Sequence, residues 1–219
     1  MNTNILNTII LGAAFLLLFG IAELLYHKAN IKVELTRKFV HVGSGLIALL
    51  FPLMLSSHWF VLFLSSSFLI ILALSTKYKM LQSINGISRQ SIGSLAFPVA
   101  IYLCFVAFAY YESSMLFYLP ILILAVCDPA AALVGKKWPL GKYTSTKESK
   151  TLMGSTAFFV SATLLTLLLM YLHQGVTMHS FLAALFIALV AAFTEAVSKN
   201  GYDNINVPTV VLLAYLITQ

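Results

Sequence analysis

Eight apolar runs follow one another along this chain, and most are long enough to cross a lipid bilayer as a helix. Such a helix needs roughly 20 apolar residues. Hydrophobic residues make up 60% of the sequence and charged residues only 9%, whereas soluble domains contain about 25% charged residues. We expect an all-α, polytopic membrane bundle of about seven to eight transmembrane helices, with residues 1–219 forming a single domain. The runs cover approximately 5–26, 39–56, 59–76, 91–111, 115–134, 152–172, 179–198 and, marginal in length, 205–218.

The basic residues divide the connections between these runs into two kinds. All 13 Lys and Arg residues fall in the first, third, fifth and seventh connections, and the second, fourth and sixth hold none. Cytoplasmic loops of membrane proteins are enriched in Lys and Arg. The alternation predicts that the odd-numbered connections face the cytoplasm and that the N-terminus lies outside. The net charge of +6 then reflects topology, and we expect no nucleic-acid partner.

Residues 127–155 combine an aspartate with a basic loop. Asp128 lies within an apolar run, where a carboxylate is costly and commonly marks a functional site. Pro129 follows it and is expected to disturb the helix. Mg²⁺ prefers one or two carboxylates together with substrate phosphates, so Asp128 is a candidate magnesium ligand. The alternative is a structural carboxylate paired with a nearby lysine. The loop beyond it carries five lysines, Lys136, Lys137, Lys142, Lys147 and Lys150.

Two properties of this loop suit phosphate binding. Gly135 permits close approach of the backbone to a ligand, although the glycine spacing is not that of a P-loop. Lys150 and Thr151 stand where the next helix should begin, followed by Gly154 and Ser155, and a helix N-terminus attracts anions. The alternatives are a solvated positive loop and ordinary capping of the helix by Thr151.

Further acids occur on the same predicted side of the membrane. Glu195 lies near the end of the seventh run, and Asp203 and Asn204 follow in a turn. These groups could share a metal–phosphate complex with Asp128. Alternatively, Glu195 pairs with Lys199 four residues later, and the Asp-Asn pair is turn chemistry.

A basic cluster stands at the start of the second run. Arg37 and His41 are four residues apart and share a helix face, with Lys38 beside them. They predict a phosphate clamp, with His41 as a polar contact or proton carrier. The alternative is snorkelling of the basic side chains at the interface, together with a histidine whose hydrogen bonds are satisfied within the protein. The small residues 43–45 predict close helix packing, and the segment 85–94 could line the same site.

Taken in order, these segments resemble the dolichol kinase, phytol kinase and CTP-dependent diacylglycerol kinase family of membrane lipid kinases. The resemblance covers roughly residues 34–210. It implies transfer of the terminal phosphate of a nucleoside triphosphate, typically CTP, to a lipid alcohol such as a polyprenol, a phytol-like alcohol or diacylglycerol. The matching residues are Arg37-Lys38 with His41, Asp128-Pro129 with Gly135-Lys136-Lys137, Lys150-Thr151 with Gly154-Ser155, and Glu195 with Asp203-Asn204 and Pro208.

The resemblance also implies roles for individual residues. Phytol kinases usually carry a Gly-Asp-Gly-x-Ala-Asp stretch, and residues 127–132 of this chain lack its second acid. The catalytic candidates are Asp128, Lys150, Glu195 and Asp203, whose three acids would hold Mg²⁺. The candidates for binding the nucleotide or the alcohol are Arg37, Lys38, His41, Gly135, Lys136, Lys137, Lys142, Thr151, Gly154, Ser155 and Asn204.

Two other functions share some of these features. Phosphatidate cytidylyltransferases share the aspartate at a helix end, the glycine and lysine loop and a Lys-Thr-x-x-Gly element. They typically add a late Pro-Gly-x-Gly-Gly-x-x-Asp-Arg run that this chain lacks. A non-enzymatic transporter of an anionic solute would need a polar path across the whole bilayer, whereas the outer half here is apolar. The kinase is therefore the favoured function, with its active site on the cytoplasmic face.

Overall fold

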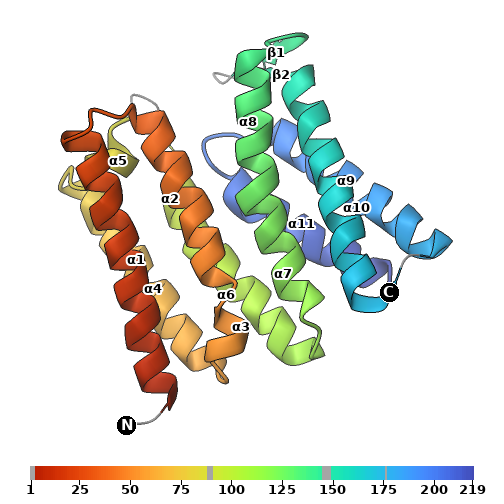
Figure 1. Cartoon of the computed structure of the whole chain (residues 1–219), viewed down its shortest axis with the longest axis horizontal. Coiled ribbons are helices and arrows are strands. Elements are labelled where there is room, and N and C mark those ends of the chain that lie inside the picture. Colours follow the sequence, from red (N-terminus) through yellow and green to blue (C-terminus); the bar gives the residue numbers. More distant parts are fainter. Residues whose placement is uncertain (1–2, 88–90, 145–148, 176) are drawn as a thin grey trace.

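The computed structural model describes residues 3–87, 91–144, 149–175 and 177–219, which are helical almost throughout (Figure 1). A π-helix, η1 (Ile123–Cys127), joins α7 to α8, and strands β1 (Lys142–Thr144) and β2 (Ser149–Thr151) form a short antiparallel hairpin. The predicted all-α fold is confirmed, and the hairpin is a small addition to it. The helices are α1 (Thr3–His27), α2 (Val33–Ala48), α3 (Phe51–Met54), α4 (His58–Lys77), α5 (Gln82–Asn85), α6 (Gly93–Tyr111), α7 (Met115–Leu122), α8 (Asp128–Lys137), α9 (Leu152–Gln174), α10 (Met178–Val197) and α11 (Asp203–Ile217).

The described residues contain seven helical segments that are long and apolar enough to cross a membrane. Two of them combine several elements. The segment Val33–Met54 contains α2 and α3, and the segment Met115–Lys137 contains α7, η1 and α8. Helix α11 has 15 residues, which agrees with the marginal length of the last apolar run. The placement of the N-terminus outside the cell stays a prediction.

The bundle has two halves that meet along α6, α7 and α11. Figure 1 shows α1, α2 and α4 in one half and α8, α9 and α10 in the other. Helix α11 packs against α10, α6 and α7, so it joins the halves although it is too short to span. Aromatic rings fill the first half, where the ring centroids of Phe15 and Phe68 lie 4.9 Å apart.

Small residues on α2 bring this helix close to η1 through Gly45 and close to α1 through Gly43. A Cβ added to Gly45 would lie 2.4 Å from the Cβ of Ala125, and one added to Gly43 would lie 2.7 Å from Leu18 Cδ1. Small side chains let helix backbones approach closely within membranes. The close packing predicted for residues 43–45 is confirmed, and it places α2 beside the segment that leads into Asp128.

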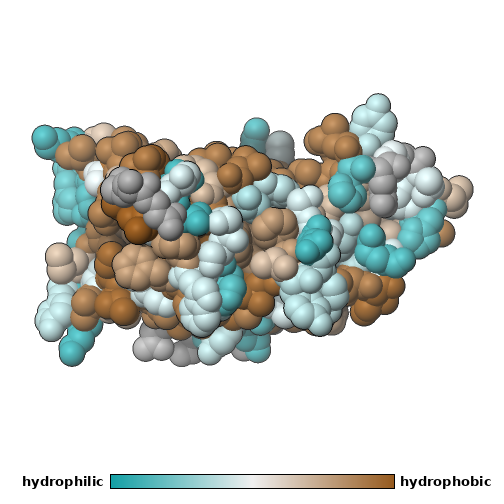
Figure 2. All heavy atoms as spheres, turned by 90° about the horizontal axis from the view of Figure 1, so that it is seen from below, coloured by the Kyte–Doolittle hydropathy of each residue, from teal (hydrophilic) through white to brown (hydrophobic). Residues whose placement is uncertain are grey.

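Apolar side chains cover much of the outer surface. The side chains of Leu17, Leu53 and Leu164 are 65%, 75% and 63% exposed, as expected of positions that face lipid. The end of the bundle nearest the N-terminus presents apolar and weakly polar side chains, with the most hydrophilic ones mainly toward the edges (Figure 2). The opposite end carries α5 and the β-hairpin (Figure 1), which belong to the basic third and fifth connections.

Candidate active site

A cavity of about 570 Å³ lies at the end of the bundle that carries the β-hairpin. Its walls come from α2, the segment before α6, α8, the hairpin, and the adjoining ends of α9, α10 and α11. The structure therefore brings together segments that lie up to about 170 residues apart in the chain. With the exception of Lys137, every candidate residue named from the sequence lines it: Arg37, Lys38, His41, Asp128, Gly135, Lys136, Lys142, Lys150, Thr151, Gly154, Ser155, Glu195, Asp203 and Asn204.

Asp128 is the first residue of α8 and stands where the transmembrane segment changes its helical geometry. In a π-helix, each carbonyl pairs with the amide five residues later. For Leu124 that position is Pro129, which has no N–H. The Nε2 of His41 lies 3.0 Å from the Leu124 carbonyl oxygen and supplies the missing donor. His41 and Pro129 together shape the helix that presents Asp128 to the cavity.

This contact changes the role expected for His41. Because a carbonyl oxygen can only accept, Nε2 must carry a proton and is engaged by Leu124. The imidazole also packs on the ring of Phe97 at 5.3 Å. His41 therefore holds α2 against η1, and only its Nδ1 is left to act as the predicted proton carrier.

Arg37 joins α2 to the segment that precedes α6. Its Nη1 donates to the Ile84 carbonyl at 2.9 Å and its Nη2 to Ser91 Oγ at 3.4 Å. The neighbouring Thr36 hydroxyl donates to the Ser83 carbonyl at 2.7 Å. The guanidinium thus reaches the cavity wall from an anchored position, and its predicted use as a phosphate clamp stays a prediction.

Three carboxylates line the cavity in different environments. Within the described part of the chain, no hydrogen bond or ion pair engages the carboxylate of Asp128. Asp203, which precedes the apolar part of α11 and lies outside the seven spans, accepts the backbone N–H of Asn204 at 3.1 Å. Burial, and then the charge of Asp128, raise the pKa of Asp203 above its ordinary value. Asp128 and Asp203 are therefore close enough for their negative charges to repel each other. A bound cation would reduce this repulsion.

These carboxylates do not form a ready-made metal centre. Among the residues that the structure describes, no group of three His, Cys, Asp or Glu side chains could hold a metal ion. Mg²⁺ needs only one or two protein carboxylates when substrate phosphates supply the other oxygens. Asp128 and Asp203 fit that requirement, so the donor set suits a magnesium–nucleotide complex.

Glu195 pairs with Lys150 and not with Lys199, the partner suggested by local spacing. Lys150 Nζ lies 2.6 Å from Glu195 Oε1 and also donates to the Glu195 carbonyl. The two side chains are only 16% and 10% exposed. The suggested pairing of Glu195 with Lys199 is therefore wrong. Both residues line the cavity, and this ion pair partly neutralises the charge that each would present to a ligand.

The backbone N–H groups at the start of α9 already have acceptors, and that of Leu152 donates to the Gly141 carbonyl at 3.0 Å. Thr151 Oγ1 accepts the Gly154 N–H at 3.0 Å, which confirms capping by Thr151. A Cβ added to Gly135 would lie 2.6 Å from the same oxygen, and one added to Gly154 would lie 3.0 Å from the Ala131 carbonyl. The two glycines therefore allow α8 and α9 to touch, and their predicted contact with a nucleotide stays a prediction.

The β-hairpin covers one side of the cavity. Tyr143 faces Lys150 across the ladder, and its hydroxyl is hydrogen-bonded to Ser155 Oγ at 2.7 Å. Lys142 pairs in register with Thr151 and lines the cavity. Sequence reasoning missed Tyr143 because strands of three residues are too short to show an alternating pattern.

The remaining basic residues are placed differently. Lys136 lines the cavity, whereas the Lys137 ammonium lies 4.5 Å from the centre of the Trp138 ring. Lys147 and Arg89 lie outside the described residues. Lys136 and Lys142 are consequently the loop lysines best placed to meet an anionic ligand without breaking an existing ion pair.

A contact between α6 and the turn before α11 was not expected. Gly201 has φ +83°, and a Cβ there would lie 2.3 Å from the Gly93 nitrogen. The Ile92 N–H donates to the Asn200 carbonyl at 2.8 Å, and Asn204 Nδ2 donates to the Gly93 carbonyl at 2.8 Å. The side-chain amide of Asn204 therefore links α11 to α6 at the wall of the cavity. The Asn-Gly dipeptide is a turn signal that could have identified this junction.

Comparison with known proteins finds one similar kinase among curated proteins. The chain is 29% identical over 187 residues to the phytol kinase of Synechocystis sp. (strain ATCC 27184 / PCC 6803 / Kazusa), and the match covers 85% of this chain and 80% of that protein. The similarity to this phytol kinase therefore extends over most of the length of both chains. No family model matches the chain, and no solved structure matches it significantly.

The similarity to a phytol kinase agrees with the architecture. The seven long apolar helices and this relative together identify an integral membrane protein. The structure also bears on the acid that residues 127–132 lack. Asp203 enters the same cavity as Asp128, so a second carboxylate is available there from a distant part of the chain.

The contact between Gly201 and Gly93 gives a stability prediction. Replacing Gly201 with Ala is expected to lower the free energy of unfolding by at least ~2 kcal/mol, because left-handed backbone costs about 1–2 kcal/mol for Ala and the new Cβ would collide with Gly93. Thermal unfolding in detergent measures the loss. Gly175→Ala is the matched control, since Gly175 has φ +82° but no atom within 4 Å of an added Cβ. Equal losses for the two variants would refute the steric explanation.

Proposed function

We propose that this protein is a membrane kinase that transfers the terminal phosphate of a nucleoside triphosphate, foremost CTP, to the hydroxyl of a lipid alcohol. One observation supports this above the others: Asp128, Asp203, Lys136 and Lys142 line a single open cavity at the basic end of an apolar bundle. A relative named phytol kinase supports both phosphate transfer and a hydrophobic alcohol as acceptor.

The proposed chemistry requires positioning and charge neutralisation more than covalent catalysis. The alcohol oxygen forms a bond to the terminal phosphorus, the bond from that phosphorus to the bridging oxygen breaks, and a nucleoside diphosphate leaves. Lys136 and Lys142 neutralise charge on the phosphates. Asp128 and Asp203 would hold Mg²⁺, which supplies a further positive charge at the phosphate oxygens when it is bound.

The proton of the alcohol needs an acceptor within the cavity. The acids that line it near the lysines are Glu195, Asp203 and Asp128, and these are the candidates. The ion pair of Glu195 with Lys150 makes Glu195 the least available, because accepting a proton there would leave the Lys150 ammonium without its counter-charge. Of Asp128 and Asp203, the carboxylate that does not bind Mg²⁺ is therefore the favoured proton acceptor in this proposal, because a bound cation lowers the proton affinity of its ligands.

The proposed reaction takes place on the cytoplasmic side, where nucleoside triphosphates are available. This orientation follows from the alternation of basic connections, since loops rich in Lys and Arg remain in the cytoplasm. The cavity is lined by residues that adjoin the first, third, fifth and seventh connections, so a nucleotide could enter it directly from that side.

Product analysis tests the proposed function. The purified protein is incubated with Mg²⁺ and either CTP or ATP, together with phytol, a polyprenol or diacylglycerol. We expect a nucleoside diphosphate and the phosphorylated alcohol in equal amounts, with CTP the better donor. Parallel reactions with phosphatidic acid test cytidylyl transfer, which releases pyrophosphate. Pyrophosphate with a CDP-lipid product, or no turnover with any acceptor, would contradict the proposal.

A further inference from the structure

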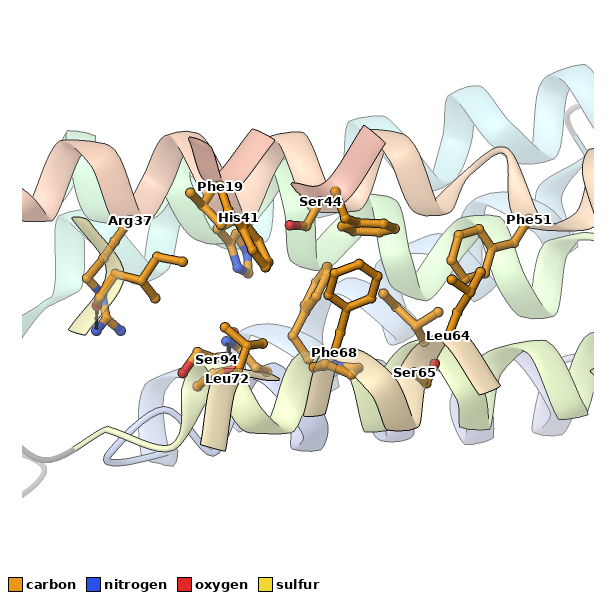
Figure 3. A pocket seen from close by; sticks show the side chains of 18 residues that line it. Phe19, Arg37, His41, Ser44, Phe51, Leu64, Ser65, Phe68, Leu72 and Ser94 are labelled. Atoms are coloured by element: carbon orange, nitrogen blue, oxygen red, sulfur yellow. Dashed lines mark hydrogen bonds between the residues drawn. The ribbon is translucent and has the colours of Figure 1, made fainter. Parts of the chain in front are cut away.

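A second, apolar pocket lies inside the N-terminal half of the bundle, between α1, α2, α4 and α6. Its volume is about 90 Å³. Aromatic and aliphatic side chains such as Phe19, Phe68 and Leu64 form most of its wall. Figure 3 shows Arg37 and His41 at one end of this pocket and Phe51 and Leu64 at the other, with Phe68 between them. The pocket is therefore elongated and changes from polar to apolar along its length.

The apolar pocket adjoins the charged cavity. Arg37, His41, Gly93 and Asn204 line both of them. His41 and Arg37 are anchored by hydrogen bonds to main-chain carbonyls, so this boundary is built from side chains held in place. A molecule with a polar head and a hydrocarbon tail could place its head in the charged cavity and its tail in the apolar pocket.

We propose that the apolar pocket binds the hydrocarbon tail of the acceptor alcohol as one linear chain, with the hydroxyl held beside His41 and Arg37. This inference rests on the proposed kinase function and goes beyond it by placing the acceptor. The tail extends from the boundary residues toward Phe51 and Leu64. The occupant is a single isoprenoid or alkyl chain.

The size of the pocket argues for one chain. A volume of 90 Å³ holds only ~6 to 9 water-sized spheres at roughly 10–15 Å³ each. The two acyl chains of diacylglycerol, side by side, would need the helices to separate. A single chain enters end first and lies along the row of aromatic rings.

The physical advantage of the pocket is that it fixes the position of the acceptor hydroxyl. A hydrocarbon tail gains little by leaving lipid for a protein wall, because both surroundings are apolar. A pocket that holds the first part of the tail instead limits where the hydroxyl can lie. Fixing the reacting oxygen in this way converts a loosely diffusing acceptor into an oriented one, which lowers the entropic part of the barrier.

Ser65 on α4 offers a test. It is 8% exposed, lines the apolar pocket near Phe51 and Leu64, and is labelled beside Leu64 in Figure 3. Ser65→Leu is expected to fill this end of the pocket. We expect at least a tenfold increase in KM for a C20 isoprenoid alcohol, with no more than a twofold change for a C5 isoprenoid alcohol, which does not reach Ser65. The control is Ser66→Leu, the same change at the next residue, which does not line the pocket and should leave both KM values unchanged.

A labelling experiment makes the inference independent of activity. A C20 alcohol with a diazirine on its tail is photolysed with the wild-type protein in detergent, without nucleotide, and the modified peptides are mapped. We expect labels on the pocket segments around Phe19, Ser44 and Phe68, and their loss in Ser65→Leu. If no alcohol is phosphorylated but these segments are labelled, the kinase proposal fails and the tail site stands. Labels confined to the lipid-facing surface, or an unchanged ratio of C20 to C5 KM values in a folded Ser65→Leu variant, would overturn the tail site.

Discussion

Replacing Asp128 with Asn is expected to reduce the rate of phosphate transfer at least ~100-fold while leaving the protein folded. The substitution keeps the shape of the side chain but removes the charge that would meet a magnesium–nucleotide complex, and loss of one such electrostatic group typically costs 10²–10³-fold. Because no hydrogen bond or ion pair engages this carboxylate among the described residues, stability should change little. The rate of labelled-phosphate transfer and the thermal unfolding midpoint in detergent are the two measurements.

The matched control for Asp128→Asn is Glu112→Gln. Glu112 is the acid in the fourth connection, which holds no Lys or Arg, and it does not line the cavity. Its neutralisation should leave the transfer rate within about twofold of the wild type, since surface substitutions away from special features usually have small effects. Undiminished turnover by folded Asp128→Asn protein would refute the assignment of Asp128 to the reaction.

Breaking the ion pair between Lys150 and Glu195 by substitution is expected to lower the stability of the protein strongly. Removing one partner leaves a buried charge without compensation, which typically costs 3–5 kcal/mol. We therefore expect Glu195→Gln and Lys150→Met each to lower the free energy of unfolding by about 3 kcal/mol. The double variant should recover most of that loss, because neither charge is then left alone.

A double-mutant cycle separates the structural from the catalytic role of this pair. Thermal unfolding gives the coupling free energy, which should exceed ~1 kcal/mol for side chains in direct contact. The transfer rate of the double variant is measured in parallel. Recovered stability with recovered activity indicates a purely structural pair, whereas recovered stability with activity still ~100-fold low assigns Lys150 or Glu195 to the reaction. Additive losses of stability would show that the pair is not coupled in solution.

Local sequence patterns were sufficient to predict the membrane architecture. Each apolar run between 5–26 and 205–218 corresponds to helical structure, because run length and hydropathy are properties of contiguous residues. The gathering of candidate residues at one end was also predictable, since alternate connections of a helical bundle lie at the same end. Asp128 is distinctive in the sequence because a carboxylate within an apolar run is rare.

Pairwise partners could not be predicted in the same way. Lys199 is four residues from Glu195 and was the partner suggested by local spacing, yet the structure selects Lys150, which lies 45 residues away. The bond from His41 to the Leu124 carbonyl depends on a π-helix and on the distance between α2 and η1. Neither property has a signature in the residues around His41.

The amino-acid sequence by itself determined the number of apolar helices, the division into basic and non-basic ends, and the set of acids and bases that could meet. The tertiary structure alone decided which of them are paired, which main-chain groups need a side-chain donor, and where an apolar pocket meets the charged cavity. The physical reason is the distance along the chain over which each effect acts. Hydropathy and loop charge act through neighbouring residues, whereas ion pairs, orphan carbonyls and cavities arise only when helices from distant parts of the chain are packed together.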